Sequence, residues 1–158
     1  MLNAADLLSY FGRRVQIPAD AADLLGETFL IATRRAHRLP QNPVEARMWL
    51  FGIARRVLAN GSRSTARHAN LVAKLQERLR TVRVEQPDGQ ALDIRAALDA
   101  LPPAQSELVR LVLWDGFTLP EAAAILGISE STARGRYQRA RANLAERLHE
   151  HRYERTGG

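Results

Sequence analysis

The sequence predicts an all-α protein built from two small helical domains. Apolar residues recur at helical spacing through most of the 158 residues, and no segment of useful length alternates in the manner of a β-strand. Residues 84–90 are polar and contain proline and glycine, which makes them the best candidate for a linker. We therefore expect a first domain over residues 1–82, a linker over 83–92, a second domain over 93–150 and a tail over 151–158.

A helix is expected over residues 20–35. One of its faces carries residues at i, i+4 spacing, namely Leu24, Leu25, Thr28, Phe29 and Ala32. Pro18 and Asp20 stand at its start, where proline fits the first turn and an acidic side chain interacts favourably with the helix dipole. Two prolines and an asparagine then predict a loop over residues 37–43.

A second helix is expected over residues 44–60, where apolar side chains such as Trp49 and Val57 return to helical spacing. Gly61 and the short polar residues that follow it are expected to break or weaken this helix, because glycine and serine favour turns. Residues 71–82 have the pattern of one further helix.

The second domain is expected to begin with two short helices. Residues 91–100 form the first, which ends before the Pro102-Pro103 pair, and residues 104–114 form the next. Gly116 follows, and it is suited to the left-handed conformation that ends many helices.

A pair of helices joined by a tight turn comes next. Thr118 and Glu121 have the spacing of a capping box, which marks the start of a helix. Gly127 begins a three-residue turn, and Ser129 can cap a last helix that runs to about His149. Two helices joined in this way have the outline of a helix-turn-helix.

The last helix separates an apolar stripe from a basic face. At about 100° per residue, its apolar residues fall within an arc of about 80°: Ala133, Tyr137, Ala140, Leu144 and Leu148. The remaining surface carries Ser131, Thr132, Arg134, Gly135, Arg136, Gln138, Arg139, Arg141 and Ala142. Arginine reads guanine and glutamine reads adenine in the major groove, so this layout favours a DNA recognition helix over a merely solvated arginine face.

Composition limits the class of protein. The net charge is +6, and residues 34–70 carry eight arginines against one glutamate and no lysine. An arginine-only stretch suits phosphate or base contact because the guanidinium group is planar and bidentate, although a solvated surface has the same composition. The chain has no cysteine, no apolar run near the roughly 18 residues that span a membrane, and no signal-peptide order at its start. We therefore expect a cytoplasmic protein without disulfides or membrane insertion.

No catalytic or metal-binding pattern is present. The histidines at 149 and 151 lack cysteines or a nearby carboxylate pair, so a solvated position is favoured over a metal site. Neither a GxSxG elbow nor a phosphate loop occurs, and no convincing triad forms among Ser62, Ser64, His68 and Asp88. We expect no enzyme activity, no cofactor and no metal.

Three segments resemble one known family. Residues 101–148 begin LPP, continue through WDGF, T-x-x-E-A-A and LGIS, and reach S-T-A-R-G-R-x-x-R-A-R. They resemble the promoter-binding C-terminal region of bacterial sigma factors, specifically the extracytoplasmic-function group. Residues 20–35, DAADLLGETFLIATRR, resemble the region 2.2 helix that binds the clamp helices of RNA polymerase. Residues 46–60, ARMWLFGIARRVLAN, resemble the helix that melts and reads the −10 element.

The resemblance implies roles for individual residues. Positions that face the polymerase correspond to Asp23, Glu27 and Leu30. The −10 strand-binding region corresponds to residues 39–43 together with Trp49, Arg55, Arg56 and Asn60, followed by Arg63 and Arg67 on phosphates. Reading of the −35 element falls to Arg134, Gly135, Gln138 and Arg139, which coincides with the face found by helical angle, including Ser131, Thr132 and Arg136.

The resemblance also implies partners and leaves two alternatives. It implies core RNA polymerase, promoter DNA and an anti-sigma factor as partners. Gly26 stands where the family usually has glutamine, Arg56 stands where asparagine is usual, and residues 7–15 match only the end of the first helical region. The alternatives are a stand-alone helix-turn-helix regulator that binds DNA without polymerase, and a sigma mimic that titrates an anti-sigma factor.

Overall fold

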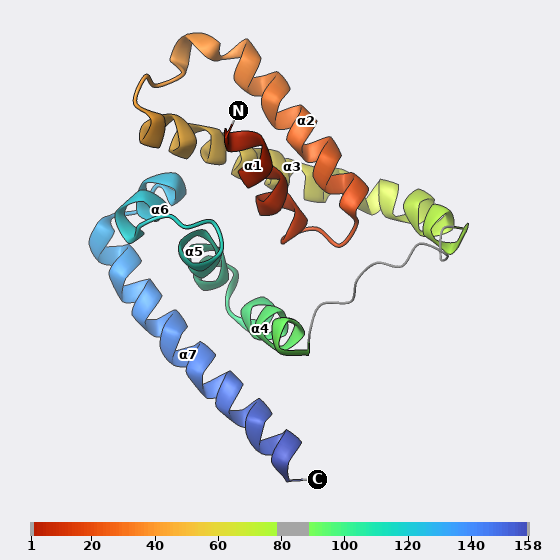
Figure 1. Ribbon diagram of the computed structural model, residues 1–158, viewed down its shortest axis with the longest axis vertical. Helices are drawn as coiled ribbons and strands as arrows, with labels where there is room; N and C mark the ends of the chain where they lie inside the picture. Colours follow the sequence, from red (N-terminus) through yellow and green to blue (C-terminus); the bar gives the residue numbers. More distant parts are fainter. Residues whose placement is uncertain (1, 79–88, 158) are drawn as a thin grey trace. The chain divides into compact units, whose positions relative to one another are not determined.

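The computed structural model describes residues 2–78 and 89–157, with side chains described for residues 3–61, 94–150 and 152–154 (Figure 1). Every regular element within these ranges is a helix, which confirms the predicted all-α class. The chain divides into two compact units, Met1–Val84 and Glu85–Gly158. The predicted linker over 83–92 falls largely outside the described residues, so its limits stay a prediction.

The first unit contains α1 (Leu2–Gly12), α2 (Pro18–Arg34), the 3-10 turn η1 (Ala36–Arg38) and α3 (Pro43–Arg78). The three α-helices pack against one another. Their core is aromatic at the point where α1 meets α3, because the ring of Tyr10 lies edge-on to both Phe11 and Phe51 with centroids 5.2 Å apart. Leu7 is also fully buried there.

The face that α2 buries differs in part from the predicted one. Thr28 is fully buried and its hydroxyl donates to the Leu24 carbonyl oxygen at 2.7 Å, so its polar atom is satisfied within the helix. Phe29, predicted to face the core, is instead exposed, and Ala21 is buried. The contact face therefore keeps Thr28, excludes Phe29 and includes Ala21.

The predicted break after residue 60 is wrong, because α3 continues without interruption through Gly61 to Arg78. Gly61 has a packing role instead. A Cβ at this position would lie 2.9 Å from Cδ2 of Leu24 on α2, closer than real contacts allow. The glycine lets α2 and α3 approach closely, and a helix tolerates one glycine at a cost of about 1 kcal/mol relative to alanine.

The second unit contains α4 (Gly89–Ala100), α5 (Pro103–Leu113), α6 (Leu119–Leu126) and α7 (Glu130–Thr156). Helix α7 contacts each of the other three, and Figure 1 shows it as the longest element of this unit. A core cluster joins α4, α5 and α7 and consists of Leu98, Leu101, Val109 and Ala140, with Trp114, Tyr137 and Leu144 packed on it.

The predicted capping signals of the second unit are confirmed. Gly116 and Gly127 have φ of 74° and 69°, the left-handed conformation that side chains disfavour. The Thr118 amide donates to Glu121 Oε1 at 2.9 Å and the Glu121 amide donates to Thr118 Oγ1 at 3.3 Å, which completes the capping box. The end of α7 was predicted too early, since the helix continues beyond His149 through most of the predicted tail to Thr156.

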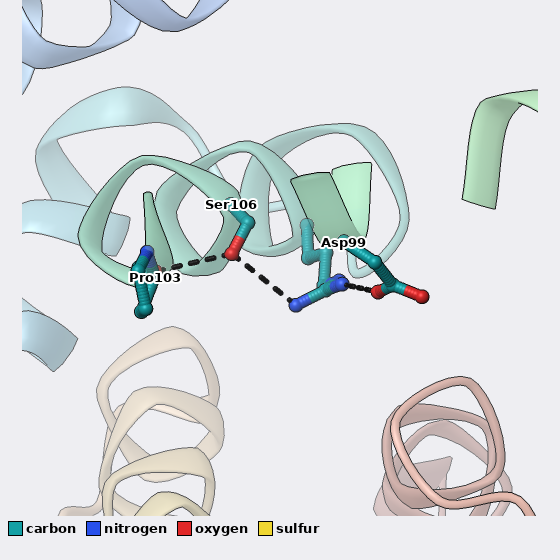
Figure 2. Close-up of polar contacts among 4 residues, drawn as sticks. Asp99, Pro103 and Ser106 are labelled. Carbon is teal, nitrogen blue, oxygen red and sulfur yellow. Dashed lines mark hydrogen bonds and ion pairs between the residues drawn. The ribbon is translucent and has the colours of Figure 1, made fainter. Parts of the chain in front are cut away.

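One arginine, Arg110, ties α4 to α5. Figure 2 labels its neighbours Asp99, Pro103 and Ser106. The guanidinium of Arg110 pairs with Asp99 of α4 and donates to Ser106 Oγ at 3.4 Å within α5. Ser106 in turn donates to the Pro103 carbonyl oxygen at 3.1 Å. The Arg110 side chain is far less exposed than that of Asp99. The ion pair therefore joins α4 to α5 through a largely covered arginine.

Candidate DNA-binding and polymerase-binding surfaces

Helix α7 begins at a fully formed cap. Ser129 Oγ accepts a hydrogen bond from the Thr132 amide at 3.2 Å and donates to Thr132 Oγ1 at 2.8 Å. The side chains of Ser131 and Thr132 are exposed beside this cap. The first turn of α7 therefore presents hydroxyl groups and helix-terminal amides, which are donors suited to phosphate oxygens.

The apolar stripe of α7 faces the core as predicted. Ala133 and Ala140 are fully buried, and Tyr137 and Leu144 pack on the core cluster. Two small buried residues let α7 approach its neighbours closely, and Asn143 Nδ2 donates to Gln105 Oε1 on α5 at 3.1 Å. These contacts fix the rotation of α7 about its own axis, which decides which side chains remain outside.

The predicted −35 residues lie on the outer face of α7. Exposed members are Ser131, Thr132, Arg134, Gln138 and Arg139, while Gly135 and Arg136 are half-buried. A Cβ on Gly135 would lie 3.6 Å from Nη1 of Arg139, so this arginine lies across the glycine. The surface thus places guanidinium and amide donors around a half-buried glycine that Arg139 covers, and such donors suit base edges in the major groove.

The predicted −10 residues on α3 differ in exposure. Arg56 and Asn60 are exposed, whereas Trp49 and Arg55 are half-buried. Arg63 and Arg67 lie in the part of α3 whose side chains are outside the described residues. The loop before α3 presents Leu39 at 47% exposure, and Asn42 Oδ1 caps α3 by accepting from the Val44 amide at 2.9 Å.

The predicted polymerase-binding residues share the outer face of α2. Asp23 and Glu27 are exposed, and Leu30 is 53% exposed. Gly26 lies between them, and a Cβ there would meet nothing within 4 Å. Nothing within the described part of the chain therefore requires a glycine at this position, and this face is acidic with an apolar end.

The arginine-rich stretch 34–70 is predicted as a whole to contact phosphates or bases, but sequence reasoning named no individual cation at the end of α2. Arg34, Arg35, His37 and Arg38 are all exposed. The local charge of the stretch extends to them, since the chain between Glu27 and Glu45 contains three arginines and no acidic residue.

Two negative findings apply to the described residues. No helix among them is long and apolar enough to cross a membrane. No group of three or more histidine and carboxylate side chains within the same ranges could hold a metal ion.

Comparison with known proteins decides the family. The model of sigma-70 region 2 matches residues 1–68, and the model of sigma-70 region 4 matches residues 91–144. The ECF RNA polymerase sigma factor SigF of Caulobacter vibrioides is 34% identical over 144 residues, which cover 90% of this chain and 79% of that protein. The ECF sigma factor EcfG of Rhodopseudomonas palustris is 32% identical over 152 residues, covering 94% and 83%.

The chain belongs to the extracytoplasmic-function group of sigma-70 factors. Sigma factors act in transcription initiation with RNA polymerase, so the family and function implied by the resemblance are confirmed.

Solved structures share the fold of this sigma factor. The sigma factor RpoE of Bartonella quintana, solved with the anti-sigma factor NepR, has a TM-score of 0.68 and 24% identity, covering 93% of this chain and 92% of that one. CnrH, solved with the cytosolic domain of CnrY, has a TM-score of 0.64 and 25% identity, covering 94% and 82%.

Proposed function

We propose that this sigma factor recruits core RNA polymerase through α2 and reads promoter DNA through α7 and α3. The observation that carries the proposal is the outer face of α7, on which Gln138 and Arg139 are exposed while Ala133 and Ala140 are buried on the opposite face. This helix begins at the Ser129 cap, just after the turn at Gly127. A helix held in this way presents the same side chains to the major groove each time it binds, which supports reading of the −35 duplex.

The first unit would supply polymerase contact and strand capture. The exposed carboxylates of Asp23 and Glu27 suit a basic partner surface, and Leu30 adds apolar area beside them. On α3, exposed Arg56 and Asn60 offer donors to phosphates and unpaired bases, with half-buried Trp49 available for stacking. The resemblance also assigns Arg55 to strand binding and Arg63 and Arg67 to its phosphates, and we propose these roles. Catalysis belongs to the polymerase, and we propose that the protein acts in the cytoplasm.

A second protein partner is also proposed. RpoE and CnrH, which share this fold, were solved with an anti-sigma factor and with the cytosolic domain of CnrY. We propose that an anti-sigma factor binds this chain as well, and two units on one chain would raise the effective concentration for a ligand that contacts both.

Polymerase binding is tested first, by size-exclusion chromatography of the purified chain mixed with core RNA polymerase. Co-elution is expected, and the Asp23→Ala/Glu27→Ala variant should lose it because the acidic part of the α2 face is removed. The matched control is Glu146→Ala/Glu150→Ala, which removes two exposed carboxylates from α7 and should still co-elute. If the unmodified chain fails to co-elute, the polymerase proposal is wrong, and anti-sigma binding or stand-alone DNA binding would then identify a mimic or a regulator.

A further inference from the structure

Gly26 is a glycine that the described fold of this chain does not use. It lies inside α2, it is exposed, and a Cβ there would meet nothing within 4 Å. Its φ is not positive, in contrast to those of Gly116 and Gly127. Glycine is one of the least favourable residues for a helix interior. Because neither backbone conformation nor packing within the first unit requires this glycine, its use is to be sought in a contact with another molecule.

Gly26 is one corner of a four-residue hole on the outer face of α2. Asp23, Gly26, Glu27 and Leu30 stand at positions i, i+3, i+4 and i+7 of this helix, the arrangement that receives a side chain of a facing helix. Asp23 and Glu27 are exposed, and Leu30 is 53% exposed. Since Gly26 has no side chain, the hole is open to the backbone at that corner and a partner can approach closely.

The two carboxylates at this hole have no cation beside them in the described part of the chain. The side chains of Asp23 and Glu27 make no hydrogen bond or ion pair there. Asp6 of the same unit, by contrast, pairs with Arg47 at 3.4 Å. Because Asp23 and Glu27 are four positions apart on one helix, their charges repel each other. A cation bound between them would relieve this repulsion.

The second unit shows how a guanidinium group can use a helix glycine. In α7 the guanidinium of Arg139 lies across Gly135, with Nη1 3.6 Å from the position of a Cβ there. Arg139 follows Gly135 by four positions. The residue four positions after Gly26 is Leu30, which does not come within 4 Å of a Cβ at Gly26. The corresponding place on α2 is therefore open, and a guanidinium group there has to come from a partner.

We propose that an arginine side chain of core RNA polymerase enters this hole, lies over Gly26 and binds the carboxylates of Asp23 and Glu27. The inference rests on the proposed function. Arginine suits the hole better than lysine, because its planar group binds two acceptors at once and packs flat against an uncharged surface. Its methylene stem would lie against Leu30. Gly26 thereby sets how closely the polymerase approaches α2.

The test measures affinity for core polymerase by titration of the full chain, labelled at its amino terminus, without DNA. Gly26→Ala should weaken binding about tenfold, because the added Cβ occupies the open corner of the hole. The same variant should unfold at a higher urea concentration, because this Cβ meets nothing within 4 Å in the free chain. A loss of affinity in a more stable chain cannot result from misfolding.

The matched control is Gly52→Ala on α3. A Cβ at Gly52 also meets nothing within 4 Å, so this variant gains helix propensity at a position outside α2 and should bind polymerase as the unmodified chain does. A double-mutant cycle tests the arginine itself. In a Glu27→Gln background, Gly26→Ala should cost less affinity than in the unmodified chain, because the two residues hold the same side chain.

Three outcomes overturn the proposal. The first is equal affinity of the unmodified chain and Gly26→Ala, or an equal loss in Gly52→Ala. The second is tighter binding by Gly26→Gln, which carries the residue usual in the family and would show that the glycine weakens the interface. The third is additive losses for Gly26→Ala and Glu27→Gln. If the unmodified chain binds polymerase in these cases, only this inference is refuted; if it does not bind, the proposed function is refuted as well.

Discussion

Two helix-interior glycines in the first unit should respond differently to alanine. At Gly26 a Cβ meets nothing within 4 Å, so Gly26→Ala gains only helix propensity and should stabilise the unit by about 1 kcal/mol. At Gly61 the Cβ would lie 2.9 Å from Leu24 Cδ2. The same gain of about 1 kcal/mol is then opposed by the cost of displacing the end of the half-buried Leu24 side chain, about 0.5–1.5 kcal/mol for an off-rotamer shift, so Gly61→Ala should be close to neutral.

A double-mutant cycle isolates the contact between the two helices. Leu24→Ala removes the obstructing methyl group, so Gly61→Ala made in that background should stabilise by about 1 kcal/mol. The coupling energy between positions 24 and 61 is then about 0.5–1.5 kcal/mol, whereas Gly26→Ala and Leu24→Ala should combine with much less coupling.

The chain offers a clean reporter for this measurement. It contains two tryptophans, Trp49 in the first unit and Trp114 in the second. In a Trp114→Phe background the fluorescence of Trp49 follows urea unfolding of the first unit alone. If Gly61→Ala stabilises as much as Gly26→Ala, the close approach of α2 and α3 at Gly61 is refuted.

Three further predictions concern the second unit. Thr118→Ala removes one half of the capping box and should destabilise this unit by about 1 kcal/mol, measured by Trp114 fluorescence in urea. Thr118→Ser should retain most of the stability. Equal losses in both variants would contradict the role of the hydroxyl. Gly127→Ala places a side chain at φ 69° and should cost about 1 kcal/mol, with Gly127→Asn costing less; thermal unfolding that is unchanged in both would argue against the left-handed turn. Gln138→Ala should reduce the discrimination between bases at one −35 base pair by about 1–3 kcal/mol. The measurement is competition for holoenzyme binding among duplexes that carry each base at that position. An equal loss of affinity for every base would show a phosphate contact instead.

The elements that the sequence predicted well depend on signals a few residues apart. The capping box needs only Thr118 and Glu121, and the turn needs only Gly127. The stripe of α7 follows from its period alone, so the buried positions Ala133 and Ala140 could be assigned before any neighbour was known.

The features that sequence reasoning missed depend on distant partners. The nearest neighbour of Gly61 is Leu24, which lies far earlier in the chain, so the sequence around Gly61 does not show that another helix packs there. The pairing of Arg110 with Asp99 likewise appears only once α4 and α5 meet at their corner. The site residues on α2, α3 and α7 came from a family pattern and from helical angle, and their roles stay predictions until binding is measured.

Helix α7 carries its exposed polar residues and its buried core residues on different faces, and this has a consequence for how promoter preference can change. Gln138 and Arg139 are exposed on the outer face of α7. Tyr137, Ala140 and Leu144, which pack in the core, lie on its opposite face. Exchanging an exposed side chain typically alters stability by less than about 0.5 kcal/mol, whereas a base contact can discriminate by about 1–3 kcal/mol. With the outer face of α7 reading the −35 element as proposed, substitutions on this face would change promoter preference at nearly constant stability, and regulators that do not cross-react could be engineered by changing this face alone.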